Sequence, residues 1–113
     1  MDKLIQYQNL IKQILTEYQR ISSQVSVVDV DEVLIFDDEI SQYLWFNIGW
    51  KQGKRVKGIS VYIRIKNDKI YIEEDLTEEG MATELMRLNV PQIDIVLAFQ
   101  PPEVRKYTEF ATV

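Results

Sequence analysis

The chain is 113 residues long, and its 46% hydrophobic and 27% charged side chains are typical of one globular domain rather than a disordered chain. It contains no cysteine and no histidine, which excludes disulfides, thiolate nucleophiles, Cys-ligated metals and imidazole acid–base chemistry. The formal net charge of −5 disfavours the whole surface as a binder of polyanions but is compatible with a local basic patch.

The first predicted element is an amphipathic helix of about five turns. Its apolar residues recur at intervals of three and four positions: Leu4, Tyr7, Ile11, Ile14, Tyr18 and Ile21. Asp2 is the expected N-cap, and Ser22-Ser23 lies near the end. The polar-interrupted N-terminus is unlike a signal peptide, and no apolar run is long enough to span a membrane, so we expect a cytoplasmic protein without membrane contact.

Four antiparallel strands are expected to follow. Val25 to Phe36 is rich in Val, Leu and Ile and predicts a first strand that begins near Val27-Val28. Alternating residues from Gln42 to Ile72, with polar turns at Lys51–Lys54 and Asn67-Asp68, predict a meander of three more strands. One predicted face of this meander is apolar: Leu44, Phe46, Ile48, Trp50, Ile59, Val61, Ile63 and Ile65. We expect the N-terminal helix to cover this face, because apolar surface needs burial.

The C-terminal third predicts further helices. Thr77 is the expected N-cap of a three-turn helix that ends before Pro91. Its buried stripe would be Met81, Ala82, Leu85 and Leu88. Residues Ile93 to Phe99 are either a buried strand or a packed turn, since periodicity does not decide between them. Pro102 can open a last short helix.

These elements define an α+β fold in one domain, residues 1–113: a four-stranded antiparallel sheet with a long N-terminal helix and C-terminal helices packed on it. Acidic clusters lie at expected strand ends and helix starts, where solvated acids collect, and neither an EF-hand spacing nor an acid-x-Lys pair accompanies them. We therefore predict no metal, no cofactor and no catalytic residue, and we expect the protein not to be an enzyme.

Four basic residues gather at one predicted hairpin tip beside Trp50: Lys51, Lys54, Arg55 and Lys57. Basic residues next to an aromatic ring can hold a nucleic-acid backbone and stack a base, and they also keep a hairpin tip soluble. Since the rest of the chain is acidic, we expect contact with nucleic acid to be indirect or weak. Direct nucleic-acid binding through this tip is the alternative function.

The second predicted face of the sheet is aromatic: Tyr43, Trp45, Tyr62 and Tyr71. Such residues are enriched at protein interfaces, although the C-terminal segment could also cover them. Small proteins most often bury such faces in two-fold homodimers. The sequence therefore predicts a homodimer, with this aromatic face or an adjacent sheet edge at the contact.

The run Pro-Pro-Glu-Val-Arg-Lys-Tyr-Thr, from Pro101 to Thr108, is the most specific motif of the chain. Further motifs accompany it: Asn47-Ile48-Gly49-Trp50, Thr77-Glu78, Gly80, Ala82, Glu84-Leu85, Val90-Pro91, Asp94-Ile95-Val96-Leu97 and Phe99. Together they resemble the XisI family, the controlling factors for excision of the fdxN element in cyanobacteria. The resemblance implies a small, non-catalytic accessory protein that acts with a XisH-like companion in site-specific DNA excision by a separate recombinase.

The C-terminal motif is a candidate partner-binding or structural motif through Pro101, Pro102, Glu103, Arg105, Lys106 and Tyr107. The two prolines fix the direction of the backbone, and the basic side chains can pair with acids. The motif either locks the chain end onto the sheet or displays it to a partner. We expect locking, because chain ends fray unless they are tied down.

Overall fold

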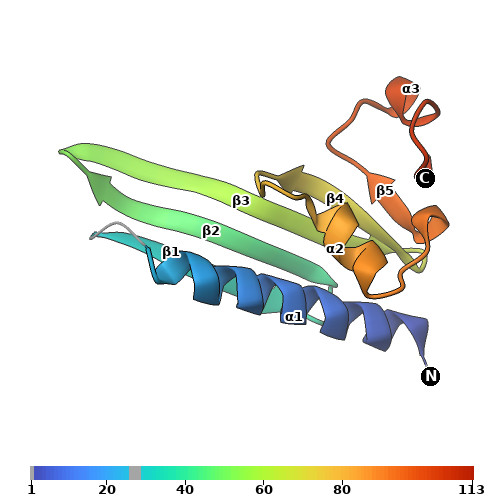
Figure 1. Ribbon diagram of the computed structural model, residues 1–113, viewed down its shortest axis with the longest axis horizontal. Helices are drawn as coiled ribbons and strands as arrows, with labels where there is room; N and C mark the ends of the chain where they lie inside the picture. Colours follow the sequence, from blue (N-terminus) through green and yellow to red (C-terminus); the bar gives the residue numbers. More distant parts are fainter. Residues whose placement is uncertain (1, 26–28) are drawn as a thin grey trace.

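The computed structural model describes residues 2–25 and 29–113 and shows α1 and α2 on one side of a five-stranded sheet (Figure 1). The elements are α1 Lys3–Ser23, β1 Val30–Asp37, β2 Gln42–Lys51, β3 Lys54–Lys66, β4 Lys69–Asp75, α2 Met81–Arg87, a 3-10 turn Gln92–Asp94, β5 Ile95–Leu97 and α3 Pro102–Arg105. The strands lie in the order β1-β2-β3-β4-β5. The α+β class and the long N-terminal helix are confirmed, and Val27-Val28, the predicted start of the first strand, lies outside the described residues.

The prediction of four antiparallel strands is wrong in one respect, because β5 adds a fifth strand parallel to β4. Antiparallel neighbours need only a tight turn, whereas a parallel neighbour needs a crossover of a dozen or more residues. Here the crossover contains α2 and the 3-10 turn, which lie between β4 and β5. The sheet is therefore mixed, and the undecided segment Ile93 to Phe99 contains a buried strand.

Both hairpin turns have the backbone conformation typical of two-residue hairpin loops. In the β2–β3 turn Gln52 has a φ of 51° and Gly53 one of 76°, and in the β3–β4 turn Asn67 and Asp68 have φ values of 52° and 60°. Two consecutive positive φ values characterise the type I′ turn, whose twist matches the right-handed twist of paired strands. These turns fix the registers of the three central strands.

Helix α1 covers the face of β2 that carries Tyr43 and Trp45, and not the face that we predicted. Both aromatic residues are buried in the core together with Ile11 and Leu15 of α1. Leu44, Phe46 and Ile48 lie on the opposite face and are only half-buried, so their predicted burial under the helix is wrong. Since β2 carries large apolar or aromatic residues on both of its faces, the alternation defined two faces but not which one the helix covers.

A β-bulge in β3 shows that the prediction of Ile59 and Val61 on one face is wrong. Trp45 pairs with Val61 and Phe46 pairs with Ile59, so Ser60 is an extra residue in the ladder. A bulge of this kind shifts the alternation of the strand by one residue. Val61 and the following core residues therefore face α1, whereas Ile59 faces the other side of the sheet.

Helix α2 begins four residues later than its predicted cap at Thr77. The carboxylate of Asp75 accepts a hydrogen bond from the Met81 N–H at 2.7 Å, and the Thr77 hydroxyl accepts one from the Gly80 N–H at 3.1 Å. Gly80 has a φ of 91°, a conformation that ends the loop just before the helix. The predicted stripe is confirmed for Met81 and Leu85, which are fully buried.

A buried polar contact ties the N-terminal helix to the far end of the chain. The Tyr7 hydroxyl donates a hydrogen bond to the carboxylate of Asp94, and the Lys3 ammonium lies 2.9 Å from the same oxygen. Burial alone would raise the pKa of Asp94, but the hydrogen bonds from Lys3 and Tyr7 outweigh it and hold this pKa below its usual value. The resulting stabilisation is present above the pKa of the unfolded carboxyl group and is lost as the pH falls through the lowered folded value.

We predict that Tyr7→Phe lowers the free energy of unfolding by about 1–3 kcal/mol, because it leaves a buried carboxylate short of one hydrogen bond. Urea denaturation at neutral pH measures the change. Tyr107→Phe is the matched control, since Tyr107 is 79% exposed and should leave the midpoint unchanged. Equal midpoints for the two variants would contradict the role of Tyr7.

Candidate functional site

The described residues offer a surface rather than a catalytic cleft as the candidate site. Within residues 2–25 and 29–113, no group of three metal-ligating side chains is placed to hold a metal ion. In the same part of the chain, no helix is long and apolar enough to cross a membrane. The remaining candidates are the uncovered sheet face, the basic hairpin tip, the C-terminal motif and a small hollow beside Trp45.

The sheet face opposite α1 is apolar where it crosses β1, β2 and β3. We call it the open face and define it by six residues: Val33, Ile35, Leu44, Phe46, Ile48 and Ile59. Val33 and Ile35 are 36% and 50% exposed. The other four are half-buried and do not belong to the core that α1 and α2 cover. Both of these helices lie on the near side of the sheet in Figure 1, so the open face is on the far side.

The four aromatic residues that we predicted as one interface do not share a face. Tyr43 and Trp45 are buried beneath α1, where the Tyr43 hydroxyl donates to Asp38 at 2.6 Å. Tyr71 is also buried and pairs with Val96 of β5. Tyr71 and Tyr62 both lie on the side away from α1, where Tyr71 is buried and Tyr62 is half-buried beside the open face. The placement was wrong because Tyr43 can bury its ring and still satisfy its hydroxyl.

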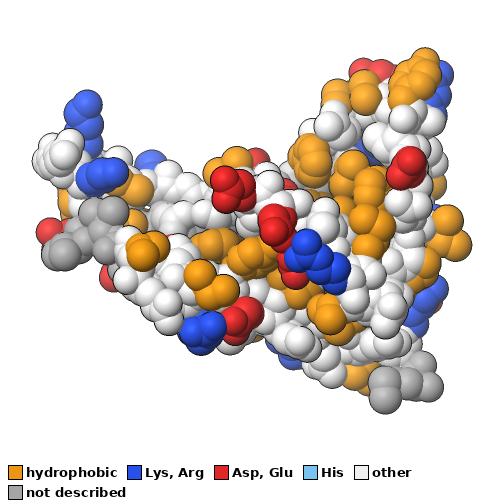
Figure 2. Space-filling model, viewed as in Figure 1, with side chains coloured by type: hydrophobic (Ala, Val, Ile, Leu, Met, Phe, Trp, Pro, Cys, Tyr) orange, Lys and Arg blue, Asp and Glu red, His pale blue; other side chains and the backbone are white. Residues whose placement is uncertain are grey.

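The basic tip is assembled as the sequence suggested. Lys51, Lys54, Arg55 and Lys57 lie at the end of the long β2–β3 hairpin, which extends beyond α1 (Figure 1). Figure 2 shows Lys and Arg side chains at the same end of the molecule. Trp50 is 54% exposed there, and the Arg55 guanidinium lies 5.1 Å from the centroid of its ring. This is an exposed cation–π pair with further positive charge around it.

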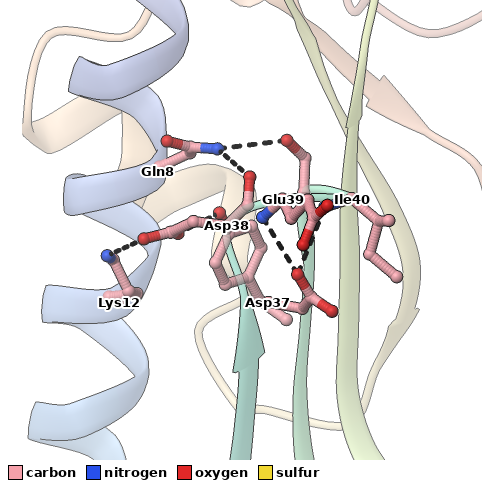
Figure 3. Close-up of polar contacts among 8 residues, drawn as sticks. Gln8, Lys12, Asp37, Asp38, Glu39 and Ile40 are labelled. Atoms are coloured by element: carbon pink, nitrogen blue, oxygen red, sulfur yellow. Dashed lines mark hydrogen bonds and ion pairs between the residues drawn. The ribbon is translucent and has the colours of Figure 1, made fainter.

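The acidic turn between β1 and β2 has a structural role (Figure 3). Asp38 points toward α1, where Lys12 lies 2.6 Å from its carboxylate, and the Gln8 amide donates to the Asp38 carbonyl at 2.9 Å. The hydrogen bond from Lys12, followed by that from Tyr43, holds the pKa of Asp38 below its usual value. Asp37 points away from the helix and closes the turn by accepting from the Glu39 and Ile40 N–H groups.

The Asn47-Ile48-Gly49-Trp50 motif has a packing explanation that the sequence did not reveal. A Cβ at Gly49 would lie 2.0 Å from the Asp29 carbonyl oxygen, which accepts a hydrogen bond from the Trp50 N–H at 2.9 Å. The Asn47 amide donates to the Ser60 hydroxyl of the bulge at 2.6 Å. Glycine is therefore needed for the close approach of two backbones, a contact that is not apparent from local sequence.

The C-terminal motif divides into one anchoring residue and several exposed ones. The Arg105 guanidinium donates to the carbonyl oxygens of Ala98 at 3.1 Å and Gln100 at 3.0 Å. The remaining predicted residues are exposed: Pro101, Pro102, Glu103, Lys106 and Tyr107. Helix α3 begins at Pro102, where we expected a last helix. The motif is therefore anchored to the preceding segment through Arg105, and its other predicted residues are exposed to solvent.

A small hollow lies between the second half of α1 and the segment after β4. It holds about 210 Å³ and is lined by Tyr18, Ile21, Ser22, Trp45, Ser60, Leu76, Thr77 and Glu78. Tyr18 stacks on Trp45 there, and neither the Tyr18 Oη nor the Trp45 Nε1 has a hydrogen-bond partner among the described residues. Its volume is below the roughly 300–1,000 Å³ of typical small-molecule sites. Three further hollows, along α1 and beside β1, hold about 390, 520 and 410 Å³.

Comparisons with known proteins cover the whole chain. The family model described as XisI protein matches residues 1–112. A XisI-like protein of known structure from Anabaena variabilis ATCC 29413 is 39% identical over 97% of this chain and 99% of that chain, with a TM-score of 0.90. The structure of fdxN element excision controlling factor XisI from the same organism is 41% identical over 99% and 100%, with a TM-score of 0.85. No curated protein matches the chain. These matches confirm the resemblance found in the sequence.

We predict that Arg105→Ala loosens the C-terminal segment by about 1–2 kcal/mol, because two half-exposed, charge-assisted hydrogen bonds are lost. Hydrogen exchange should then quicken at the amide of Ala111, which bonds the Ile95 carbonyl at 2.9 Å. Lys106→Ala removes a neighbouring exposed charge and serves as the control. Unchanged exchange in Arg105→Ala would show that the segment is held by other contacts.

Proposed function

The chain belongs to the XisI family, and we propose that it is a non-catalytic controlling factor in the excision of a DNA element. The proposal is supported by the solved relative that is described as an fdxN element excision controlling factor. In this proposal the protein makes and breaks no bonds. It binds a XisH-like companion and acts with a separate recombinase that carries out the cleavage and joining.

The single observation that carries this proposal is the open face. Soluble monomers rarely leave contiguous apolar patches in water, and such patches commonly mark protein interfaces. The open face lies on three paired strands, so its side chains are held in place by the ladder rather than by a loop. A rigid apolar surface of this kind favours binding a protein over performing chemistry.

Co-expression with the XisH-like companion tests the proposal. We expect the companion to retain the wild-type chain, and Phe46→Glu to weaken binding by about 2 kcal/mol or more, because a charge would enter the centre of the interface. Ile93→Glu is the control, since Ile93 is an exposed apolar residue that does not belong to the open face. Urea denaturation of each variant verifies that it is folded.

Two results would count against this proposal. A companion that fails to retain the wild-type chain contradicts partner binding. A companion that retains Phe46→Glu as strongly as the wild type places its contact away from the open face.

Direct nucleic-acid binding is the second candidate, and the tip supports it. Residues 51–57 contain four of the thirteen basic side chains of the chain and no acidic one. The exposed Trp50 ring lies beside Arg55 and offers a surface on which a base can stack. Basic charge around one aromatic ring is a pattern of proteins that hold a single strand or an opened duplex.

We expect any such binding to weaken with salt and to be reduced in a Lys54→Ala, Arg55→Ala double variant. Each lost phosphate contact should reduce the salt slope by about one. Titration of labelled DNA at several salt concentrations measures both effects, with Lys106→Ala as the control at the other end of the molecule. The second candidate is refuted if the wild type does not bind at low salt or if the double variant binds with the same slope.

A further inference from the structure

The open face carries opposite charges on its two outer strands. The registers place the residues of β1, β2 and β3 in four rows: Asp31–Ile48–Lys57, Val33–Phe46–Ile59, Ile35–Leu44–Tyr62 and Asp37–Gln42–Arg64. Residues opposite each other in paired strands share a face, so all twelve side chains lie on the side away from α1. Both acids belong to β1, both bases belong to β3, and the two rows between them carry no charge.

This arrangement is self-complementary under one rotation. A two-fold axis that runs along β2, in the plane of contact, places β1 of one copy over β3 of the other in the same row order. Asp31 then lies opposite Lys57, and Asp37 lies opposite Arg64. The apolar residues meet in the same way: Val33 lies opposite Ile59, Ile35 opposite Tyr62, and the β2 residues Leu44, Phe46 and Ile48 meet their own copies.

We propose that a second copy of this chain covers the open face, related to the first by a two-fold axis along β2. The inference rests on the proposed function only in treating the open face as a protein interface, and it makes a second copy the occupant with which the companion competes for that face. Two sheets packed in this way have nearly aligned strands, the usual arrangement of a β-sandwich, with a layer spacing of about 10 Å. Each copy contributes the same patch, as two-fold dimers require.

The charges also disfavour the other two-fold arrangement. An axis perpendicular to the strands would place β1 over β1 and β3 over β3 with the row order reversed. Asp31 would then lie opposite Asp37, and Lys57 opposite Arg64. Like charges opposite each other in an interface are strongly unfavourable. With the axis along β2, each of these four charges instead lies opposite a charge of the other sign.

The four charged groups retain the capacity for these contacts. Asp31 and Lys57 are exposed and take part in no ion pair among the described residues. Arg64 bonds Glu73 through Nε and Nη2, which leaves its Nη1 group for a second acid. Asp37 uses Oδ1 for its own turn, and its Oδ2 atom remains for a base.

Charge reversal of the Asp31–Lys57 contact tests the proposal with the full chain. We expect light scattering at micromolar concentration to give twice the 13.3 kDa mass of one chain. Asp31→Lys and Lys57→Glu should each raise the dimer Kd about tenfold or more, because each variant creates two like-charge contacts per dimer. The double variant Asp31→Lys/Lys57→Glu restores opposite charges and should return the Kd toward the wild-type value.

Control variants and the companion separate the possible outcomes. Glu78→Lys reverses an exposed charge that is not part of the open face and should leave the Kd unchanged. Asp31 and Lys57 are exposed, so both single variants should keep the fold, which circular dichroism verifies. A dimer that the single variants do not weaken, or that the double variant does not restore, overturns the axis along β2.

A wild-type chain that stays monomeric overturns the proposal outright. If this monomer still binds the XisH-like companion and Phe46→Glu weakens that binding, the open face belongs to the companion and the proposed function stands. If the chain dimerises as expected but no companion is retained, the dimer stands and the proposed function falls. The two claims can therefore fail independently.

Discussion

The packing of α1 against one face of the sheet is the contact on which the rest of the structure depends. One helix can cover only one face, and Ile11 and Leu15, which have no exposed surface, fix it on the Tyr43 side. At ~1.5–3 kcal/mol for each fully buried aliphatic side chain, this contact outweighs any single polar tie along the helix. The same choice leaves the opposite face without a helix over it among the described residues, and we propose this face as the site where another molecule binds. The position of α1 thus determines both which residues form the core and which residues remain in the open face.

Two β-bulges, one in β3 and one in β4, change which face of the sheet the residues beside them occupy. The bulge at Ser60 turns Ile59 to the open face and Val61 to the core, and a second irregularity next to Tyr62 leaves Glu73 unpaired in the β4 ladder. Glu73 can then bond Arg64 on the open side of the sheet. Bulges also increase local twist. The row pattern of the open face depends on the first of these shifts, the bulge at Ser60.

The features that could be predicted from sequence are those that depend on neighbouring residues. The α1 stripe, its Asp2 cap and both hairpin turns follow from local spacing and turn chemistry. The basic tip was also predictable, because its four charges are close in sequence. Strand β5 has three residues and pairs with β4 across a helical crossover, so no local signal marks it as parallel. The covered face could not be predicted because Leu44 and Tyr43 are both suited to burial, and only long-range packing decides between their sides.

The contact between Tyr7 and Asp94 also constrains the order in which the protein can be completed. During synthesis, the meander from β2 to β4 can pair as soon as its residues have emerged, because its contacts are close in sequence. The first turns of α1 must wait for a partner 87 positions later, so the N-terminal end of this helix is secured last. Until then the apolar stripe of α1 packs against a surface that is still incomplete. A nascent chain halted before Asp94 would therefore hold a paired meander with α1 packed on it through Ile11 and Leu15, but with the first turn of the helix unsecured.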